Sequence, residues 1–136
     1  MRSGYAREIY LITCGELITL FQVNNIIKAV HKLSGKGADV GIGGIINNMR
    51  GVSREEEIVE EFGSLVGVPV IEHIPRSHTV QDAEMEAKTV IEAFPESEQA
   101  KIYRGLARKI FENQSVHIPK PVTMDDIKKI FLKVLS

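Results

Sequence analysis

Hydrophobic runs and polar gaps follow one another along this chain in an order that predicts strand, helix, strand, helix and strand. The first run, residues 9–13, is short, nearly continuous and flanked by charge, which predicts a strand buried on both faces. Two more strands are predicted over residues 40–49 and 68–74. Strands that alternate with helices in this way are typical of a parallel sheet with right-handed crossovers. The pattern therefore predicts an α/β fold in which three parallel strands are flanked by helices.

Two helices are predicted between these strands. Gly35 and Gly37 should end the first helix, and Gly67 should end the second. Ser53 and Glu56 have the spacing of a capping box, which predicts the start of the second helix. The apolar stripes are Leu17, Leu20, Phe21, Ile27 and Val30 in the first helix, and Ile58, Val59, Phe62, Leu65 and Val66 in the second.

The remainder of the chain is predicted to be helical. A short turn is expected near residues 77–85, then a helix over about 97–113, then a last helix capped by Thr123. The inward-facing residues should be Ile102, Leu106 and Ile110 in the longer helix, and Ile127, Ile130, Phe131, Val134 and Leu135 in the last one. Three strands make a thin sheet for this architecture, so the chain is interpreted as a single partial domain over residues 1–136.

Composition and charge narrow the function classes. The chain has 136 residues, of which 43% are hydrophobic and 26% charged, as is usual for a globular domain. The net charge is −1, and acidic and basic residues are interspersed along the chain. The sequence therefore has no cluster of basic residues that would indicate binding to nucleic acid or to a membrane surface. No apolar stretch reaches membrane-spanning length, and the polar start is unlike a signal peptide. The single cysteine fits a reducing compartment, so we expect a cytoplasmic location.

The common catalytic and metal-binding motifs are missing from this sequence. It contains no GxxxxGK[ST], GxGxxG or GxSxG segment, and its four histidines show no metal-ligand spacing. Gly43 and Gly44 lie inside a predicted strand, where glycine indicates close backbone approach rather than phosphate binding. The acidic run 55–57 is interpreted as a solvated first helical turn. No catalytic residue and no metal ligand is therefore predicted.

Three polar clusters lie where the ligands of parallel sheets bind, at the carboxyl ends of strands. Residues 47–51 (NNMRG) could read a base edge through asparagine amides, or simply form a turn. In residues 74–84, Arg76 could stand at the edge of the sheet and Ser77 could cap a helix. The alternative is that this segment is only a strand-to-helix junction. Gln99 and Tyr103 share one helix face, where Tyr103 could pack or contact a ligand.

A series of segments resembles the carboxyl-terminal half of the nitrogenase iron protein family. They are REIYLITCGE, NNIIKAV, GGIINNMRG, IPRSHTVQDAE, KTVIEAFPESEQAKIYRGLARKI and IPKPVTMDDI, in family order over essentially the whole chain. The resemblance implies a P-loop-type fold and a homodimer that binds ATP or ADP and shares one [4Fe-4S] cluster. Such a dimer hydrolyses ATP and passes electrons to a catalytic partner protein in nitrogen fixation. Both cluster cysteines and the phosphate loop would lie before this segment, so Cys14 is interpreted as a buried apolar residue and not a cluster ligand.

The resemblance also implies an adenine and ribose pocket within this chain. Position 77 is Ser where the family often has Asp, and position 47 is Asn where the nitrogenase branch commonly has Cys. The residues that match the pocket are Asn48, Pro75, Arg76, Val80, Gln81, Gln99 and Tyr103.

Two kinds of function follow from these observations. The first is a truncated nitrogenase iron protein-like chain, inactive alone, that keeps a weak half-site for the nucleotide. The alternative is a non-catalytic interaction module that docks on a full-length homologue or on the missing amino-terminal half. Within the same resemblance, the chain could also be a fragment of a related ATP-dependent tetrapyrrole reductase.

Overall fold

The computed structural model describes residues 7–136, and a sheet of three parallel strands in the order β1-β2-β3 lies at its centre. The strands are β1 (Glu8–Thr13), β2 (Gly41–Asn48) and β3 (Val70–Ile74). The helices are α1 (Leu17–Gly35), α2 (Glu55–Val66), α3 (His78–Met85), α4 (Val90–Ala93), α5 (Glu98–Glu112) and α6 (Met124–Leu135). The predicted α/β class and the order strand, helix, strand, helix, strand are confirmed.

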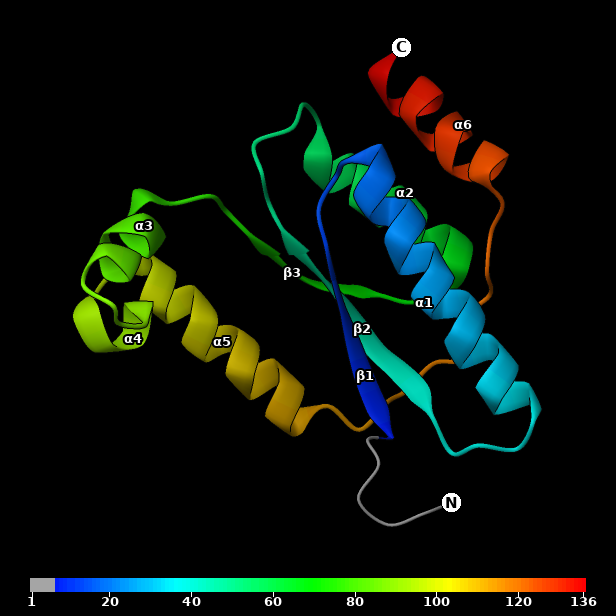
Figure 1. The fold of residues 1–136 in the computed structure, drawn as a ribbon, viewed down its shortest axis with the longest axis horizontal. Coiled ribbons are helices and arrows are strands. Elements are labelled where there is room, and N and C mark those ends of the chain that lie inside the picture. Colours follow the sequence, from blue (N-terminus) through cyan, green and yellow to red (C-terminus); the bar gives the residue numbers. More distant parts are fainter. Residues whose placement is uncertain (1–6) are drawn as a thin grey trace.

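Helices cover the two faces of this sheet unequally (Figure 1). On one face lie α1 and α2, and α6 packs against both of them. On the other face α5 packs against β3, with α3 and α4 at its amino-terminal end. The residues predicted to face inward from α5, Ile102, Leu106 and Ile110, are half-buried because only part of this face is covered. No helix in the described part of the chain is long and apolar enough to span a membrane.

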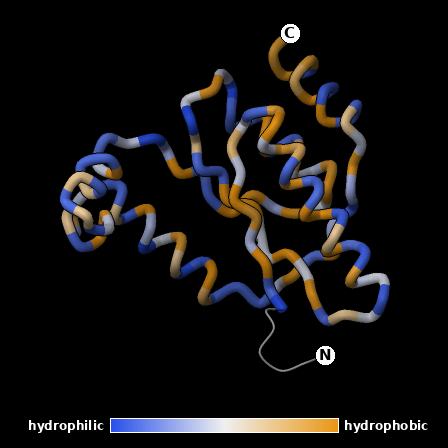
Figure 2. The backbone as a smooth tube through the Cα atoms, in the orientation of Figure 1, coloured by the Kyte–Doolittle hydropathy of each residue, from blue (hydrophilic) through white to orange (hydrophobic). Residues whose placement is uncertain are grey.

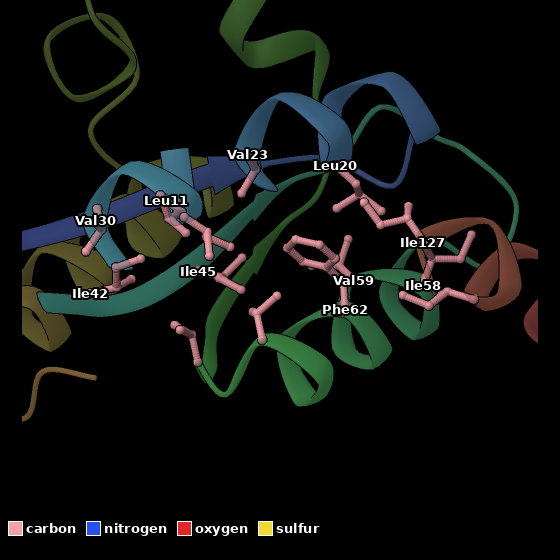
Figure 3. Close-up of a cluster of buried hydrophobic side chains, with 14 of the residues drawn as sticks. Leu11, Leu20, Val23, Val30, Ile42, Ile45, Ile58, Val59, Phe62 and Ile127 are labelled. Carbon is pink, nitrogen blue, oxygen red and sulfur yellow. The ribbon is translucent and has the colours of Figure 1, made fainter. Parts of the chain in front are cut away.

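The main core fills the space between the sheet and the layer of α1, α2 and α6 (Figure 3). Leu20, Ile27, Ile45, Ile58 and Phe62 have no exposed surface there. Burying each such side chain contributes roughly 1.5–3 kcal/mol. Figure 2 shows hydrophobic positions concentrated in the central strands, while hydrophobic and hydrophilic positions alternate along α5. The sheet is therefore anchored mainly from one face.

Some residues that were predicted to be buried are exposed. The side chain of Ile12 in β1 is 64% exposed, so the expectation that this strand is buried on both faces is wrong. The reason is that β1 ends the sheet and α5 packs on β3, at the opposite side. Leu65 and Leu135 are also exposed, on the outer sides of their helices.

The helix ends follow most of the predicted signals. Gly67 ends α2 in the left-handed conformation, and Thr123 forms a capping box with Asp126 at the start of α6. The predicted capping box of Ser53 and Glu56 is wrong, because α2 is preceded by Arg54 and has no side-chain cap. The short helix α4 was not predicted, although Thr89 and Glu92 cap it.

The glycine pair in β2 makes room for neighbouring side chains. A Cβ atom on Gly43 would lie 2.6 Å from Cζ of Tyr10, and one on Gly44 would lie 2.7 Å from Cγ2 of Ile71. The expectation of close backbone approach is wrong, because the atoms nearest to both glycines belong to side chains.

Candidate functional site

A cleft of about 650 Å³ lies at the carboxyl edge of the sheet. Its walls come from the loops that follow β2 and β3 and from α3 and α5. Its volume is in the range of small-molecule sites, and parallel sheets bind ligands at this edge. The lining residues are Asn48, Met49, Arg50, Arg76, Ser77, His78, Val80, Gln81, Glu84 and Tyr103.

Five of the seven residues predicted for a nucleoside pocket line this cleft together. They are Asn48, Arg76, Val80, Gln81 and Tyr103. Asn48 ends β2, and the chain reaches Arg76 two residues after β3 ends, so both strands deliver side chains to the same edge. Ser77 caps α3 by accepting a hydrogen bond from the amide of Thr79 at 3.2 Å, as predicted.

The other two predicted residues, Pro75 and Gln99, do not line the cleft. Gln99 is 4% exposed, at the start of α5, and does not line the cleft. Its Nε2 atom donates to the main-chain oxygen of Pro75 and to the hydroxyl of Tyr103, both at 3.3 Å. Gln99 therefore connects the loop after β3 to the aromatic ring that lines the cleft.

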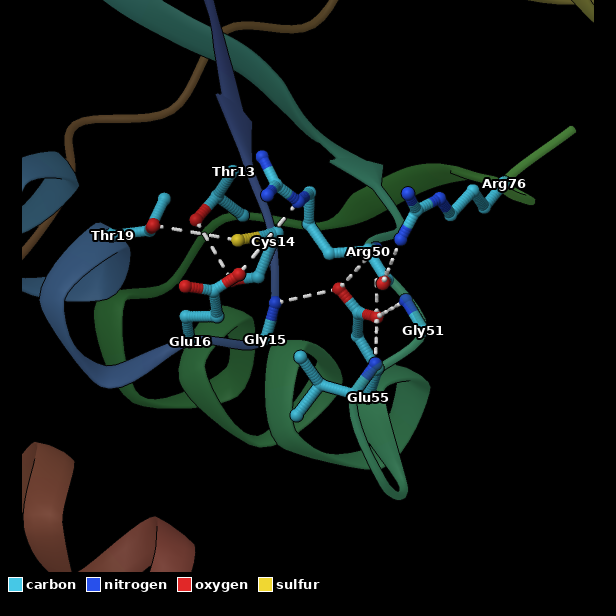
Figure 4. Close-up of polar contacts among 10 residues, drawn as sticks. Thr13, Cys14, Gly15, Glu16, Thr19, Arg50, Gly51, Glu55 and Arg76 are labelled. Carbon is cyan, nitrogen blue, oxygen red and sulfur yellow. Dashed lines mark hydrogen bonds and ion pairs between the residues drawn. The ribbon is translucent and has the colours of Figure 1, made fainter. Parts of the chain in front are cut away.

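The loop after β2 is tied to its neighbours through Arg50. Nη1 of Arg76 donates to the main-chain oxygen of Arg50 at 3.3 Å, and Nε of Arg50 lies 3.8 Å from Oε1 of Glu16 (Figure 4). Both arginines line the cleft together with Glu84, so its lining carries charges of both signs. The ion pair is exposed, and such pairs contribute at most about 1 kcal/mol.

Glu55 holds this loop in place from the first turn of α2. Its carboxylate accepts hydrogen bonds from the amides of Arg50 at 3.0 Å, Gly51 at 3.0 Å and Val52 at 3.1 Å (Figure 4). It accepts a further bond from the amide of Gly15, after β1, at 2.8 Å. Glu55 is 2% exposed, so the expectation of a solvated acidic turn is wrong for this residue. The sequence signal that could have indicated it is the glycine-containing loop just before the helix start.

Cys14 lies beside this loop and is buried, as predicted. Its Sγ atom is 3.4 Å from Oγ1 of Thr19 in α1. The thiol thus packs at the junction of β1 and α1. No group of three or more histidine, cysteine or acidic side chains in the described residues could hold a metal ion.

A second group of polar side chains connects β2, β3 and α2, and it begins at Asn47, the residue before Asn48 of the cleft. Asn47, His73 and Glu60 form a chain in which Nδ2 of Asn47 lies 3.0 Å from Nδ1 of His73, and Nε2 of His73 lies 2.9 Å from Oε1 of Glu60. Asn47 is fully buried, and its Oδ1 has no partner among the described residues. The contact between Asn47 and His73 was not predicted, because it depends on the register of β2 and β3.

Comparison with known proteins gives one consistent result. Residues 1–135 match the family described as "4Fe-4S iron sulfur cluster binding proteins, NifH/frxC family". The chain is 44% identical over 133 residues to "Nitrogenase iron protein 2" of Methanothermobacter thermautotrophicus, covering 98% of this chain and 48% of that protein. It is 41% identical over 133 residues to "Nitrogenase iron protein 2" of Rhodobacter capsulatus, with the same shares covered. The chain thus spans about half the length of these relatives.

Proposed function

The chain belongs to the NifH/frxC family of 4Fe-4S iron–sulfur cluster binding proteins, and we propose that it supplies the adenine- and ribose-binding part of an ATP-dependent reductase. The observation that carries this proposal is the cleft at the carboxyl edge of the sheet, where Asn48, Gln81 and Tyr103 face one space. These residues come from three separate segments of the chain.

The side chains of the cleft suit a nucleoside. The amides of Asn48 and Gln81 each offer donors and an acceptor, which is what recognition of a base edge requires. The ring of Tyr103 offers an aromatic surface on which a base can stack. Arg50 and Arg76 add positive charge on one side of the cleft, where ribose hydroxyls or a phosphate would be attracted.

The chain does not by itself fit the iron–sulfur cluster that its family name includes. A [4Fe-4S] cluster is held by four thiolates, and this sequence contains one cysteine, which is buried against Thr19. Two copies would offer two thiolates at most. We therefore assign no electron-transfer step to this chain alone.

We also expect that the chain alone does not hydrolyse ATP. Phosphoryl transfer in P-loop enzymes depends on the loop backbone, its lysine and a bound magnesium ion. The sequence contains no GxxxxGK[ST] segment. The electron-accepting partner and the homodimer belong to the proposal as properties of the intact reductase.

Ligand-observed NMR with adenosine, ADP and ATP tests the proposal. Without a phosphate loop we expect weak binding, on the order of millimolar or about −4 kcal/mol. Exposed arginines contribute little, so the three ligands should differ by less than about fivefold. Gln81→Ala should abolish the signal, and Asp82→Ala, an exposed neighbour outside the cleft, should leave it unchanged. No binding of any of the three, or binding unaffected by Gln81→Ala, would contradict the proposal.

A further inference from the structure

We propose that His73 forms a pH-sensitive contact, in which a proton added to its ring turns the side-chain amide of Asn47 end for end. The ring lies between Asn47 of β2 and Glu60 of α2, so three elements of the fold meet there. We call these three side chains the His73 contact. The proposal concerns the interior of the α2 face of the sheet, and nucleotide binding plays no part in it.

The side chain of Asn47 uses only one of its two polar ends. It is fully buried opposite His73 in the register of β2 and β3, and Oδ1 has no hydrogen-bond partner among the described residues. A buried polar atom without a partner is rare and destabilising. Asn24, which is also buried, uses both ends on the main chain of Val122, with Nδ2 donating at 2.7 Å and Oδ1 accepting at 3.0 Å. The orientation of Asn47 therefore depends on a single contact, the one with His73.

The two ring nitrogens of His73 have different roles in this arrangement. Nδ1 lies 3.0 Å from the NH2 group of Asn47, which can only donate, so Nδ1 accepts and carries no proton. Nε2 lies 2.9 Å from Oε1 of Glu60, a carboxylate that can only accept, so Nε2 carries the proton. This arrangement is that of a neutral ring.

A second proton on the ring reverses the role of Nδ1. Both nitrogens of a charged imidazole are donors, so an N–H group at Nδ1 would face the NH2 group of Asn47. Half a turn of the Asn47 amide brings Oδ1 to Nδ1 and gives this oxygen the partner that it lacks. The terminal torsion of asparagine has a broad, twofold preference, so both orientations are accessible. A hydrogen bond from a charged ring is also stronger than one between neutral groups.

The surroundings of His73 admit this proton. Its side chain is 22% exposed and lines a hollow of about 570 Å³, formed with residues of α2 and α6. On the opposite face of β3, Glu72 is paired with Lys109. Glu56 and Glu60 have no lysine or arginine partner among the described residues, so a positive ring would be attracted to them. The charged groups of the hollow are Glu56, Glu60 and two ion pairs, Arg54 with Glu57 and Lys133 with Glu61.

NMR of the ¹⁵N-labelled chain tests the proposal first through the neutral ring. Long-range proton–nitrogen spectra identify which nitrogen of each histidine carries the proton. We expect Nε2–H for His73 and the opposite, Nδ1–H, for His31, whose Nδ1 lies 2.9 Å from the main-chain oxygen of Pro119 and has to donate. A neutral His73 with its proton on Nδ1 would overturn the proposal, because Oδ1 of Asn47 would then already have its partner.

The second measurement follows the Asn47 side chain while the pH is lowered from about 8 to 5, the range in which histidines become charged. The nuclear Overhauser contact between its NH2 group and Hε1 of His73 should be lost, with the same midpoint as the ring signals. The NH2 group of Asn24 should not follow this midpoint, because both ends of that amide are bonded. An Overhauser contact that stays constant while the His73 ring becomes charged would overturn the proposal.

A pair of variants shows whether His73 is the cause. In His73→Gln the ring is absent, so the Asn47 signals should stay constant over the same pH range. His31→Gln removes a histidine that does not contact Asn47, and the Asn47 signals should then change with pH as in the parent. Asn47 signals that still change in His73→Gln would overturn the proposal. The measurements on the parent chain remain decisive if His73→Gln does not fold.

Discussion

The amide nitrogen of Gly15 lies 2.8 Å from Oε2 of Glu55, a contact across 40 residues of sequence. It joins the loop after β1 to the first turn of α2, and the same carboxylate holds the loop after β2. Two loops at the carboxyl edge of the sheet are therefore tied to the start of α2 by one side chain. Its charge is offset by four main-chain amides rather than by a cation.

Replacing the Glu55 carboxylate should destabilise the protein. In Glu55→Gln the amide group offers one acceptor and turns two donors toward main-chain N–H groups, so at least one buried group loses its partner. We expect a loss of about 2–4 kcal/mol in the free energy of unfolding. Urea unfolding followed by circular dichroism measures it. Glu56→Gln, exposed in the same turn, should change stability by less than about 0.5 kcal/mol, and equal effects would contradict the assignment.

The contact also makes Gly15 sensitive to any side chain. A Cβ atom there would lie 2.6 Å from Cγ and 3.2 Å from Cα of Glu55. We expect Gly15→Ala to cost about 1–3 kcal/mol by overpacking. Gly105→Ala is the matched control, since it lies in α5 with nothing within 4 Å of its Cβ position and should stabilise the helix by about 0.5–1 kcal/mol. Thermal unfolding of both variants would show opposite shifts.

Tyr103 should carry much of the affinity for a nucleoside. Removing the ring in Tyr103→Ala takes away the stacking surface, and base–aromatic stacking contributes about 1–3 kcal/mol. Adenosine binding should weaken about tenfold or more in an NMR titration. Phe111→Ala, whose ring is 90% exposed near the other end of α5, should bind adenosine as before. Gln99→Ala should give an intermediate loss, because it frees the Tyr103 hydroxyl and the loop at Pro75.

Anaerobic treatment of the purified chain with iron and sulfide should yield no stoichiometric cluster. The donor set is one buried thiol for each chain, where four thiolates are needed. Iron content and the charge-transfer absorbance measure the outcome, and Cys14→Ser provides the baseline for adventitious iron. Iron at four atoms for each pair of chains, lost in Cys14→Ser, would show a cluster site of another kind.

The capping box of α6 should give stability a dependence on pH in the acidic range. The hydrogen bond from the main chain of Thr123 lowers the pKa of the Asp126 carboxyl group below its ordinary value. A lowered pKa means that the contribution is complete above the pKa of the unfolded chain and is lost as pH falls through the folded value. The stability difference between the parent and Asp126→Asn should therefore shrink toward zero in acid. Urea unfolding of both proteins across the acidic range measures this difference, and a difference that stayed constant into acid would contradict the assignment.

Local signals predicted much of the fold, because they depend on near neighbours in the sequence. Gly67 and Thr123 mark helix ends through their own backbone and side chain, and both predictions are confirmed. The short apolar runs predicted strand ends at Met49 and Ile74, and the observed ends are Asn48 and Ile74. Parallel pairing of these strands brings Asn48 and Arg76 to one edge.

What the sequence did not reveal depends on distant partners. Glu55 looks like any acidic residue in a first helical turn, and only the fold of the preceding loop and the position of Gly15 bury it. The direction of the Gln99 side chain depends on the position of the main-chain oxygen of Pro75, to which it donates. The contact of Asn47 with His73 depends on strand register. Each of these contacts depends on how a loop folds or on strand register, and none has a periodic signature in the sequence.

Lys109 of α5 places a positive charge against the outer edge of β3. A sheet with two open edges can add subunits at both ends and grow into a filament, whereas a sheet with one open edge closes after a single addition. Within the described residues the Lys109 ammonium group occupies the outer edge of β3, because Nζ bonds the main-chain oxygen of Ile71 there. Replacing Lys109 by an apolar residue would remove that charge, and we expect the chain to associate more readily as a result.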